Sequence, residues 1–335
     1  MKKFFKLIFL AFLFIFLVSS FSSFTFAQKN EPIIIKVALV QPEEQSEGKF
    51  ATKFKELVEE KTNGAAKVEI YFRSQLGTQK DYLEGLRLGT LEVTWVTPGF
   101  FSSYEPILNI FELPYLWKSR EQALWMFNGP LKKMIQERVE KDGVKLLTFF
   151  EVGFREITNN VRPIYTPEDL KGLKIRVPQA KISVDSLTAM GANASPLSGS
   201  ELYLALQHGI FDGQENPYGQ IYFNKWYEVQ KYLSKTNHLY MVHMVLYSEK
   251  LWNQLSKDIQ DKIEDAAQEA AVYEVKVAVD EEASSEIALK KVGMEINEVD
   301  VALFKEAVKP LYQKYIDEYG PEAEKAINMI QMSQF

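Results

Sequence analysis

The stretch TQKDYLEGLRLGTLEVTWVTP, residues 78–98, holds a helix and a strand in one short unit. Thr78 is a helix-capping residue type, Asp81 falls in the predicted first turn, and Gly89 is placed to end the helix. The following LEVTWV, residues 91–96, alternates side chains as a half-buried strand does. A helix followed at once by a strand is the building block of α/β folds.

A second unit with the same order of signals lies at SELYLALQHGIFDGQENP, residues 200–217. Ser200 precedes the predicted helix, Gly209 ends it, and the strand that follows runs into Pro217, as the first runs into Pro98. Identity between the two units is low, so the sequence predicts a weak internal repeat. Such a repeat indicates two lobes built on one plan.

The ends of the two repeated strands are the first candidates for a binding site. In open α/β sheets, ligands bind beyond the carboxyl ends of the strands. Thr97 and Asn216 occupy those ends, each directly before a proline. We therefore expect both side chains to face a common cleft.

The region from residue 33 to 246 alternates strand-like and helix-like segments in the same way. IIIKVALV (33–40) reads as a buried strand, GKFATKFKELVEEKTNG (48–64) as a helix that Gly64 ends, and AAKVEIYF (65–72) as a strand. This alternation predicts the α/β class, with two lobes.

Residues 257–291 form a different pattern. Apolar residues recur at helical intervals from Ile259 to Ala270 and beyond, and no proline occurs before Gly293. At 1.5 Å per residue, roughly 35 residues make a helix of about 50 Å, which is long enough to brace both lobes. A coiled coil is the alternative, but the alanine-rich stripe lacks a sustained heptad repeat.

The N-terminus has the features of a signal peptide. Three early lysines precede an apolar run from Leu7 to Val18, about a dozen residues, which is too short to cross a bilayer. Thr25-Phe26-Ala27 is a plausible cleavage site, so residues 1–27 are the predicted signal peptide and the mature chain begins near Gln28. An uncleaved anchor would need apolar residues from Ser19 to Thr25 as well.

The composition excludes several kinds of function. The chain has no cysteine, so it can form neither disulfides nor thiolate metal sites. The net charge is −6 with no long run of one sign, which argues against a nucleic-acid partner. The three histidines lack metal-ligand spacing, and no nucleotide-binding or hydrolase motif occurs, so no metal or cofactor is predicted. Asp212 and Glu215 could act as an acid/base pair, although Asp212-Gly213 is first a turn signal.

An arginine lies inside the strand-like stretch GLKIRVPQA, residues 172–180. Leu173, Ile175 and Val177 fall on one face of the predicted strand, and Lys174 and Arg176 fall on the other. A solvated basic face is one interpretation. The other is that Arg176, just before Pro178, directs its planar guanidinium into a cleft, where it could hold a carboxylate by two parallel hydrogen bonds.

Several segments together resemble the substrate-binding proteins of tripartite ATP-independent periplasmic (TRAP) transporters, of the dicarboxylate-binding (DctP-like) type. These segments are GLKIRVPQA, YFRSQLGTQKDYLEGLRLGTLEVTW, FELPYLW and SELYLALQHGIFDGQENPYGQIYFNKWYEVQKYLSKTNH. The resemblance extends from about residue 34 to past residue 310. The K-I-R-V-P strand and the D-G-Q-E-N-P segment are its most specific parts.

The resemblance implies a two-lobed periplasmic substrate-binding fold with a hinge, which closes on a small organic acid and delivers it to an ion-gradient-driven TRAP permease. By motif match, Arg176 is the carboxylate-binding arginine and Asn216 is a ligand-contacting asparagine. Arg155, in GFREITNN, matches a second ligand arginine, with a surface ion pair as its alternative. Gln41, Thr97, Tyr218 and His243 are the further candidates for ligand selection.

Two departures leave the identity of the acid open. Sialic-acid-binding members carry a glutamate near the position of Thr97 and an aromatic residue near Gly199. Dicarboxylate-binding members commonly have P-K-G where this chain reads Ser46-Glu47-Gly48. The ligand expected is a dicarboxylate, a sugar acid or another monocarboxylate.

The domain and partner predictions follow from the same resemblance. Lobe I is expected to comprise residues 33–152 and 241–281, and lobe II residues 153–240 and 282–335, with the long helix at 257–291 spanning both. We expect a periplasmic monomer that is not an enzyme. The alternatives are an exported enzyme acting on a small acid, and a sensor partner that presents its ligand to a membrane receptor. The amphipathic tail would serve a dimer as well as packing on its own lobe.

Overall fold

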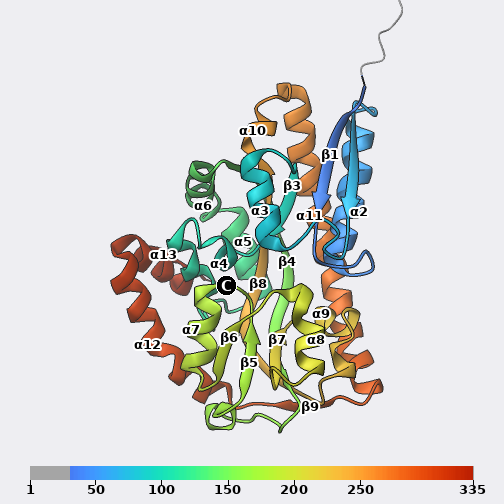
Figure 1. Ribbon diagram of the computed structural model, residues 1–335. Helices are drawn as coiled ribbons and strands as arrows, with labels where there is room; N and C mark the ends of the chain where they lie inside the picture. The colour runs from blue at the N-terminus through green and yellow to red at the C-terminus, as the bar shows by residue number, and fades with distance from the viewer. Residues whose placement is uncertain (1–30, 335) are drawn as a thin grey trace, which may run out of the picture. The chain divides into compact units, whose positions relative to one another are not determined.

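The strands of the computed structural model form one mixed sheet, and the model describes residues 31–334. The predicted signal peptide and its cleavage site lie outside the described residues. The strands are β1 (Ile33–Ala38), β2 (Ala66–Tyr71), β3 (Val93–Val96), β4 (Val144–Asn159), β5 (Lys174–Val177), β6 (Asn193–Pro196), β7 (Gly213–Asn216), β8 (Tyr232–Ser248) and β9 (Glu295–Glu298). Their order across the sheet is β2-β1-β3-β8-β4-β7-β5-β6, and β9 pairs with β8 (Figure 1).

Helices connect most of these strands, which confirms the predicted α/β class. The α-helices are α2 (Ser46–Lys61), α3 (Gln79–Leu88), α4 (Pro98–Phe101), α5 (Arg120–Asn128), α6 (Lys132–Val139), α7 (Lys181–Ala189), α8 (Leu202–Gln207), α9 (Tyr218–Phe223), α10 (Glu249–Trp252), α11 (Lys257–Lys291), α12 (Val301–Tyr319) and α13 (Pro321–Met332). Short 3₁₀ helices are η1 (Pro106–Glu112), η2 (Glu140–Asp142), η3 (Pro167–Leu170), η4 (Gly199–Glu201) and η5 (Trp226–Glu228). None of the helices between residues 31 and 334 is long and apolar enough to cross a membrane.

The first repeat unit folds as its sequence predicts. The Thr78 side chain accepts a hydrogen bond from the backbone N–H of Asp81, whose carboxylate accepts from Thr78 in return. Gly89 ends α3 with φ of 77°, a left-handed conformation that favours glycine. Strand β3 then leads into Pro98, the first residue of α4.

The second unit differs at the start of its helix. Gly209 has φ of 66° and β7 runs into Pro217, as predicted. Ser200, however, does not cap α8, which begins at Leu202. Ser200 lies inside η4, where its hydroxyl is hydrogen-bonded to that of Ser198 at 2.9 Å, and Glu201 occupies the N-cap position of α8.

Two long antiparallel strands, β4 and β8, occupy the middle of the sheet. Their pairing shifts register at three places, the last of them between Arg155 and Ile157. Such irregularities bend a strand and change the direction of nearby side chains. Arg155 on β4 therefore lies beyond the last residue of β3 and beyond the last residue of β7.

Helix α11 contributes residues to two separate hydrophobic cores. Its bounds agree with the predicted 257–291. Ile263, Ala266 and Ala270 pack with α2, β1 and β3 in one core, and Leu289 packs with α8 and α9 in another. A third core includes residues of α3, α5, α6, α7, α12 and α13. The helix thus connects two cores, as a bracing helix must.

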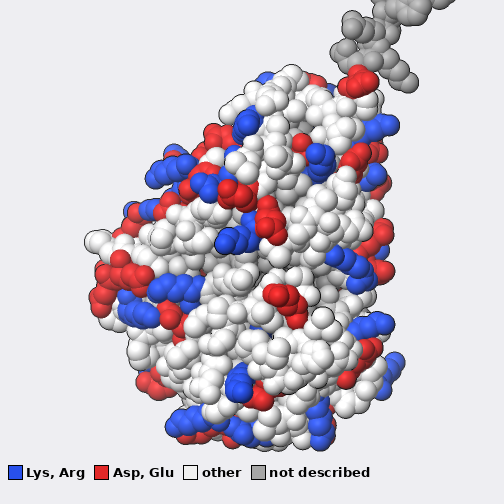
Figure 2. All heavy atoms as spheres, viewed as in Figure 1, with Lys and Arg blue, Asp and Glu red and all other residues white. Residues whose placement is uncertain are grey.

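Charges of both signs are mixed over the face shown in Figure 2, with no large area of one sign. This agrees with the absence of long single-sign runs in the sequence. It gives no indication of a polyanion-binding surface on that face.

Candidate functional site

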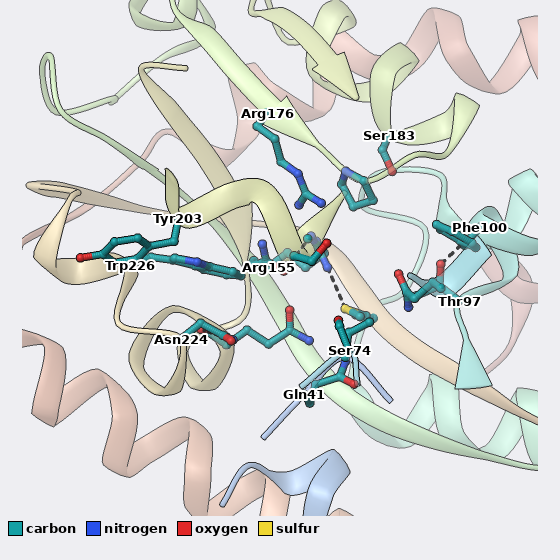
Figure 3. Close-up of a pocket in the computed structure, with 18 of the residues that line it drawn as sticks. Gln41, Ser74, Thr97, Phe100, Arg155, Arg176, Ser183, Tyr203, Asn224 and Trp226 are labelled. Atoms are coloured by element: carbon teal, nitrogen blue, oxygen red, sulfur yellow. Dashed lines mark hydrogen bonds between the residues drawn. The ribbon is translucent and has the colours of Figure 1, made fainter. Parts of the chain in front are cut away.

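A cavity of about 300 Å³ lies where the strand ends of the two repeat units meet (Figure 3). Five of the predicted site residues line it: Gln41, Thr97, Arg155, Arg176 and Asn216. They come from separate places in the chain, after β1 and β3 and within β4, β5 and β7. The cavity size is at the lower end of the range for small-molecule sites.

Arg176 enters the cavity from β5 as a buried cation. Its side chain is only 5% exposed, and Nε and Nη2 donate to the carbonyl oxygen of Leu197 at 2.9 and 2.5 Å. No carboxylate of residues 31–334 forms an ion pair with it. Burial, with Arg155 nearby, lowers the pKa of Arg176 to about 10, so it is charged at neutral pH. The solvated basic face considered for this strand is therefore wrong for Arg176 and right for the exposed Lys174.

Arg155 is also buried, but its charge is already paired. Its Nε and Nη2 bind the two carboxylate oxygens of Glu215 at 2.5 and 2.9 Å. Nη2 also donates to Asn216 Oδ1 at 3.1 Å, and Nη1 contacts Met241 Sδ at 2.7 Å. The surface ion pair considered as an alternative for Arg155 is replaced by a buried bidentate pair.

Glu215 is held as a carboxylate by this pairing. Burial alone would raise its pKa, but Arg155 and a hydrogen bond from His238 outweigh burial and hold the pKa to about 2. His238 Nε2 lies 3.2 Å from the carboxylate, and its Nδ1 bonds the hydroxyl of Thr236 at 2.8 Å. The charges of Arg155 and Glu215 cancel, so among the described residues that line the cavity Arg176 is the cation without an ion-pair partner.

The acid/base pair considered for Asp212 and Glu215 does not form a reactive centre. The Asp212 carboxylate accepts from the backbone N–H of Lys174 at 2.7 Å, beside β5. Glu215 is engaged by Arg155 as described above. Each carboxylate thus has a structural partner, as the turn interpretation of Asp212-Gly213 predicts.

Thr97 and Glu112 form a second polar group on the cavity wall. Thr97 Oγ1 accepts from the backbone N–H of Phe100 at 3.2 Å and caps α4. Glu112 Oε1 accepts from the backbone N–H of Gly99 at 2.6 Å, and burial raises the pKa of this carboxyl. Thr97 thus orients the start of α4 as well as lining the cavity.

Amide side chains supply further polar groups. Asn216 Nδ2 donates to Gln214 Oε1 at 2.5 Å, which fixes the Asn216 amide. Gln41 is buried, and its Oε1 has no hydrogen-bond partner within the described chain. Gln220 lines the cavity and donates from Nε2 to Glu47 Oε1 at 2.8 Å. A buried acceptor without a donor, such as Gln41 Oε1, is costly unless a bound group supplies one.

Aromatic walls complete the cavity and were missed at the sequence level. Trp226, Tyr203 and Phe100 line it (Figure 3). Tyr203 is fixed by a hydrogen bond from its hydroxyl to Glu228 at 2.9 Å. Trp226 also packs in the core around Leu289, because one ring can have one face in the core and one in a cavity.

Tyr218 and His243 do not line the cavity. Tyr218 begins α9 and packs into the core around Leu289. His243 lies on β8 two residues beyond Met241, and its ring packs against Phe150 with a centroid distance of 5.3 Å. Burial lowers the pKa of His243 to about 3, so it is neutral there. Two residues along a strand are about 7 Å, which places His243 past the end of the cavity.

No cluster of three or more histidine and acidic side chains suited to a metal ion occurs in residues 31–334. The described cavity groups are instead the unpaired guanidinium of Arg176, the paired guanidinium of Arg155, the Glu112 carboxyl held by the Gly99 backbone, amides, hydroxyls and aromatic rings. This combination suits a small polar anion.

Known proteins share this sequence and fold. Residues 37–318 match the family described as bacterial extracellular solute-binding protein, family 7. The C4-dicarboxylate-binding periplasmic protein DctP of Rhodobacter capsulatus is 32% identical over 89% of this chain and 90% of its own. The sialic acid-binding periplasmic protein SiaP of Vibrio cholerae is 33% identical over 88% of this chain and 92% of its own.

A solved structure agrees with the sequence matches. The crystal structure of a TRAP periplasmic solute-binding protein from Polaromonas, bound to D-erythronate, superposes with a TM-score of 0.87 at 32% identity and covers 90% of this chain and 99% of that one. The chain therefore belongs to bacterial extracellular solute-binding protein family 7, the family of the TRAP periplasmic solute-binding proteins.

Proposed function

We propose that this protein captures a small organic acid outside the cytoplasm and delivers it to a TRAP permease in the membrane. The observation that carries the proposal is the buried guanidinium of Arg176, which faces a cavity of about 300 Å³ without an acidic partner in the described chain. A buried charge is costly unless a counter-ion reaches it. A ligand carboxylate is the natural counter-ion, because the planar guanidinium can bind it with two hydrogen bonds.

The other cavity residues have supporting roles in this proposal. Asn216 and Arg155 form one rigid group beside Arg176, since Arg155 Nη2 bonds Asn216 Oδ1 at 3.1 Å. Gln41 and Thr97 approach from the opposite strand ends. The wall residues Trp226 and Tyr203 would cover the apolar side of the ligand. Tyr218 and His243 have no part in the site as now proposed.

Closure of two lobes would complete the site. The proposed lobe I, residues 33–152 and 241–281, contributes Gln41, Thr97 and Met241 to the cavity. The proposed lobe II, residues 153–240 and 282–335, contributes Arg155, Arg176 and Asn216. A ligand that touches both sets stabilises the closed form by its greater affinity for that form. The closed form would be the one that docks on the permease.

The charge balance of the cavity favours a monocarboxylate. Arg155 is neutralised by Glu215, and Arg73, at the edge of the cavity, is exposed and paired with Glu44 at 3.3 Å. One unpaired cation, Arg176, matches one carboxylate. Gln41 Oε1, a buried acceptor without a donor, calls for a ligand hydroxyl. A hydroxylated monocarboxylate such as an aldonate or uronate satisfies both groups better than a C4-dicarboxylate does.

A thermal-shift panel tests the proposal. The chain from residue 28 is heated with succinate, lactate, D-erythronate, D-galacturonate or sialic acid, alongside Arg176→Ala. We expect hydroxylated monocarboxylates to raise the melting temperature more than succinate does, because ligands that bind only the folded state stabilise it. The variant should show no such shift.

Two further results bear on the alternatives. If no acid shifts the melting temperature, and no co-purified acid is released on unfolding, the carboxylate proposal is wrong. Mass spectrometry of each acid after incubation should return it unchanged, because we propose binding without chemistry. A new product would instead support an exported enzyme.

A further inference from the structure

Three glutamates lie together behind the cavity, where α2, α9 and α11 meet. These residues, Glu47 on α2 and Glu274 and Glu281 on α11, are named the acid cluster here. Glu47 and Glu274 are fully buried, and neither carboxyl oxygen of Glu274 has a hydrogen-bond partner in residues 31–334. Glu281 Oε2 accepts from the backbone N–H of Ser46 at 2.7 Å.

The surroundings of the acid cluster contain more acid than base. Glu151 on β4 faces Glu274, and Glu121 and Glu282 lie near Glu151. The cation at this place is Arg120, which binds Glu151 Oε2 at 2.6 Å and also Glu282. Tyr240 donates its hydroxyl to Glu151. Arg120 is therefore engaged by other acids, and no lysine or arginine within residues 31–334 forms an ion pair with the acid cluster.

The contact between α2 and α9 runs through the acid cluster. Gln220 on α9 donates to Glu47 Oε1 at 2.8 Å. The Glu281 carboxylate lies against Gly219, where a Cβ would clash with Glu281 Oε1 and force that carboxylate to move. Figure 1 shows α11 passing beside both α2 and α9. Gln220 lines the cavity, so the same side chain takes part in the cavity wall and in the α2–α9 contact.

We propose that the acid cluster is a proton-operated latch between α2 and α9, which takes up protons when the cavity closes and releases them when it opens. The inference rests on the lobe closure proposed above, since α2 belongs to lobe I and α9 to lobe II. Carboxylates buried close together without a cation repel one another, so the closed form favours their protonated state. Opening would separate α9 from α2 and let water reach the carboxylates, which favours their charged state.

The raised pKa values of the acid cluster agree with proton uptake in the closed form. Burial raises the pKa of Glu47 to about 7. Burial and the neighbouring Glu47 raise the pKa of Glu281 to about 8, and burial with three acidic neighbours raises that of Glu274 well above its ordinary value. The latch would therefore work across neutral pH.

The absence of cysteine in the chain allows a direct test without any ligand. Lys80→Cys on α3 and Leu204→Cys on α8 place spin labels at exposed positions on the two sides of the cavity, next to the lining residues Gln79 and Tyr203. Pulsed electron spin resonance then gives the distance distribution between pH 5.5 and pH 8.5. We expect the short-distance population to shrink as pH rises, with the closed-to-open ratio changing by up to about tenfold per pH unit for each proton involved.

Variants of the acid cluster provide the control. Glu47→Gln with Glu281→Gln resembles the protonated state of two of the three acids and should weaken the pH dependence strongly, with Glu274 left to titrate. Glu56→Gln, an exposed position on the same helix α2, should leave the pH dependence as in the parent. If the double variant does not fold by circular dichroism, Glu281→Gln alone should weaken the dependence. A parent distribution that is the same at every pH, or an unchanged dependence in the Glu47 and Glu281 variants, would overturn the latch.

Discussion

At the scale of single residues, Arg176 should dominate ligand affinity. Removing it leaves a ligand carboxylate buried without a counter-ion, which costs about 3–5 kcal/mol, or roughly a hundredfold to several thousandfold in Kd. Isothermal titration of Arg176→Ala with the acid that gives the largest thermal shift measures this loss. Arg73→Ala is the control, because Arg73 is exposed and paired with Glu44, and it should change Kd by about threefold or less. Equal losses in both variants would contradict the assigned role of Arg176.

Glu215 should matter for stability through its ion pair with Arg155. Glu215→Gln leaves a buried guanidinium unpaired, so we expect it to lower the free energy of unfolding at pH 7 by about 3–5 kcal/mol. The pKa of Glu215 is held to about 2, so this contribution is present above about pH 4.5 and is lost as pH falls towards 2. Urea unfolding at pH 7 and pH 3 measures both effects. Glu44→Gln, in an exposed pair, should cost less than about 1 kcal/mol at either pH.

At the scale of single elements, the two repeated helices offer a matched pair of substitutions. Thr78→Ala removes the hydroxyl that accepts from the backbone N–H of Asp81 at the start of α3, while the bond from the backbone N–H of residue 78 to the Asp81 carboxylate stays. The loss of this N-cap side chain should destabilise the protein by about 1 kcal/mol. Ser200→Ala should have almost no effect on stability, because Ser200 lies in η4 and does not cap α8. Chemical unfolding of both variants without ligand compares them. A cost for Ser200→Ala as large as that for Thr78→Ala would contradict the observed start of α8.

At the scale of the whole molecule, buried acids should make stability fall as pH rises. Burial raises the pKa of Glu47 and Glu151 to about 7 and that of Glu156 and Glu281 to about 8. Each group binds its proton more tightly in the folded than in the unfolded chain. Their stabilisation is complete below about pH 4.5 and is lost as pH rises to about 8. We expect the free energy of unfolding to fall by more than about 2 kcal/mol between pH 5 and pH 8.5. Glu47→Gln should reduce this fall, whereas a curve that rises over the same range would contradict it.

Local signals in the sequence predicted most of the elements. These signals are the capping box at Thr78, the glycines at 89 and 209, and the proline-free run of 257–291. Each acts on residues close to it in the chain, so its effect on a helix can be predicted from the sequence. Ser200 precedes the second helix as the sequence indicates, but it does not cap α8, because residues 199–201 form η4 first. That choice depends on loop geometry, which spacing does not reveal.

Some of the cavity residues could be predicted from the sequence, and the roles of others depend on the tertiary structure. Arg176, Asn216 and Thr97 could be named from strand ends, prolines and motifs, because those features act along the chain. The pairing of Arg155 with Glu215, 60 residues apart, depends on how β4 and β7 lie in the sheet, and it decides that Arg176 is the free cation. The positions of Trp226 and Gln220 in the cavity wall, and of His243 outside the cavity, likewise depend on how distant segments lie in the fold. The sequence by itself determined the α/β class, the bracing helix and the family, whereas only the tertiary structure decided which charges cancel, because cancellation depends on distances across the fold.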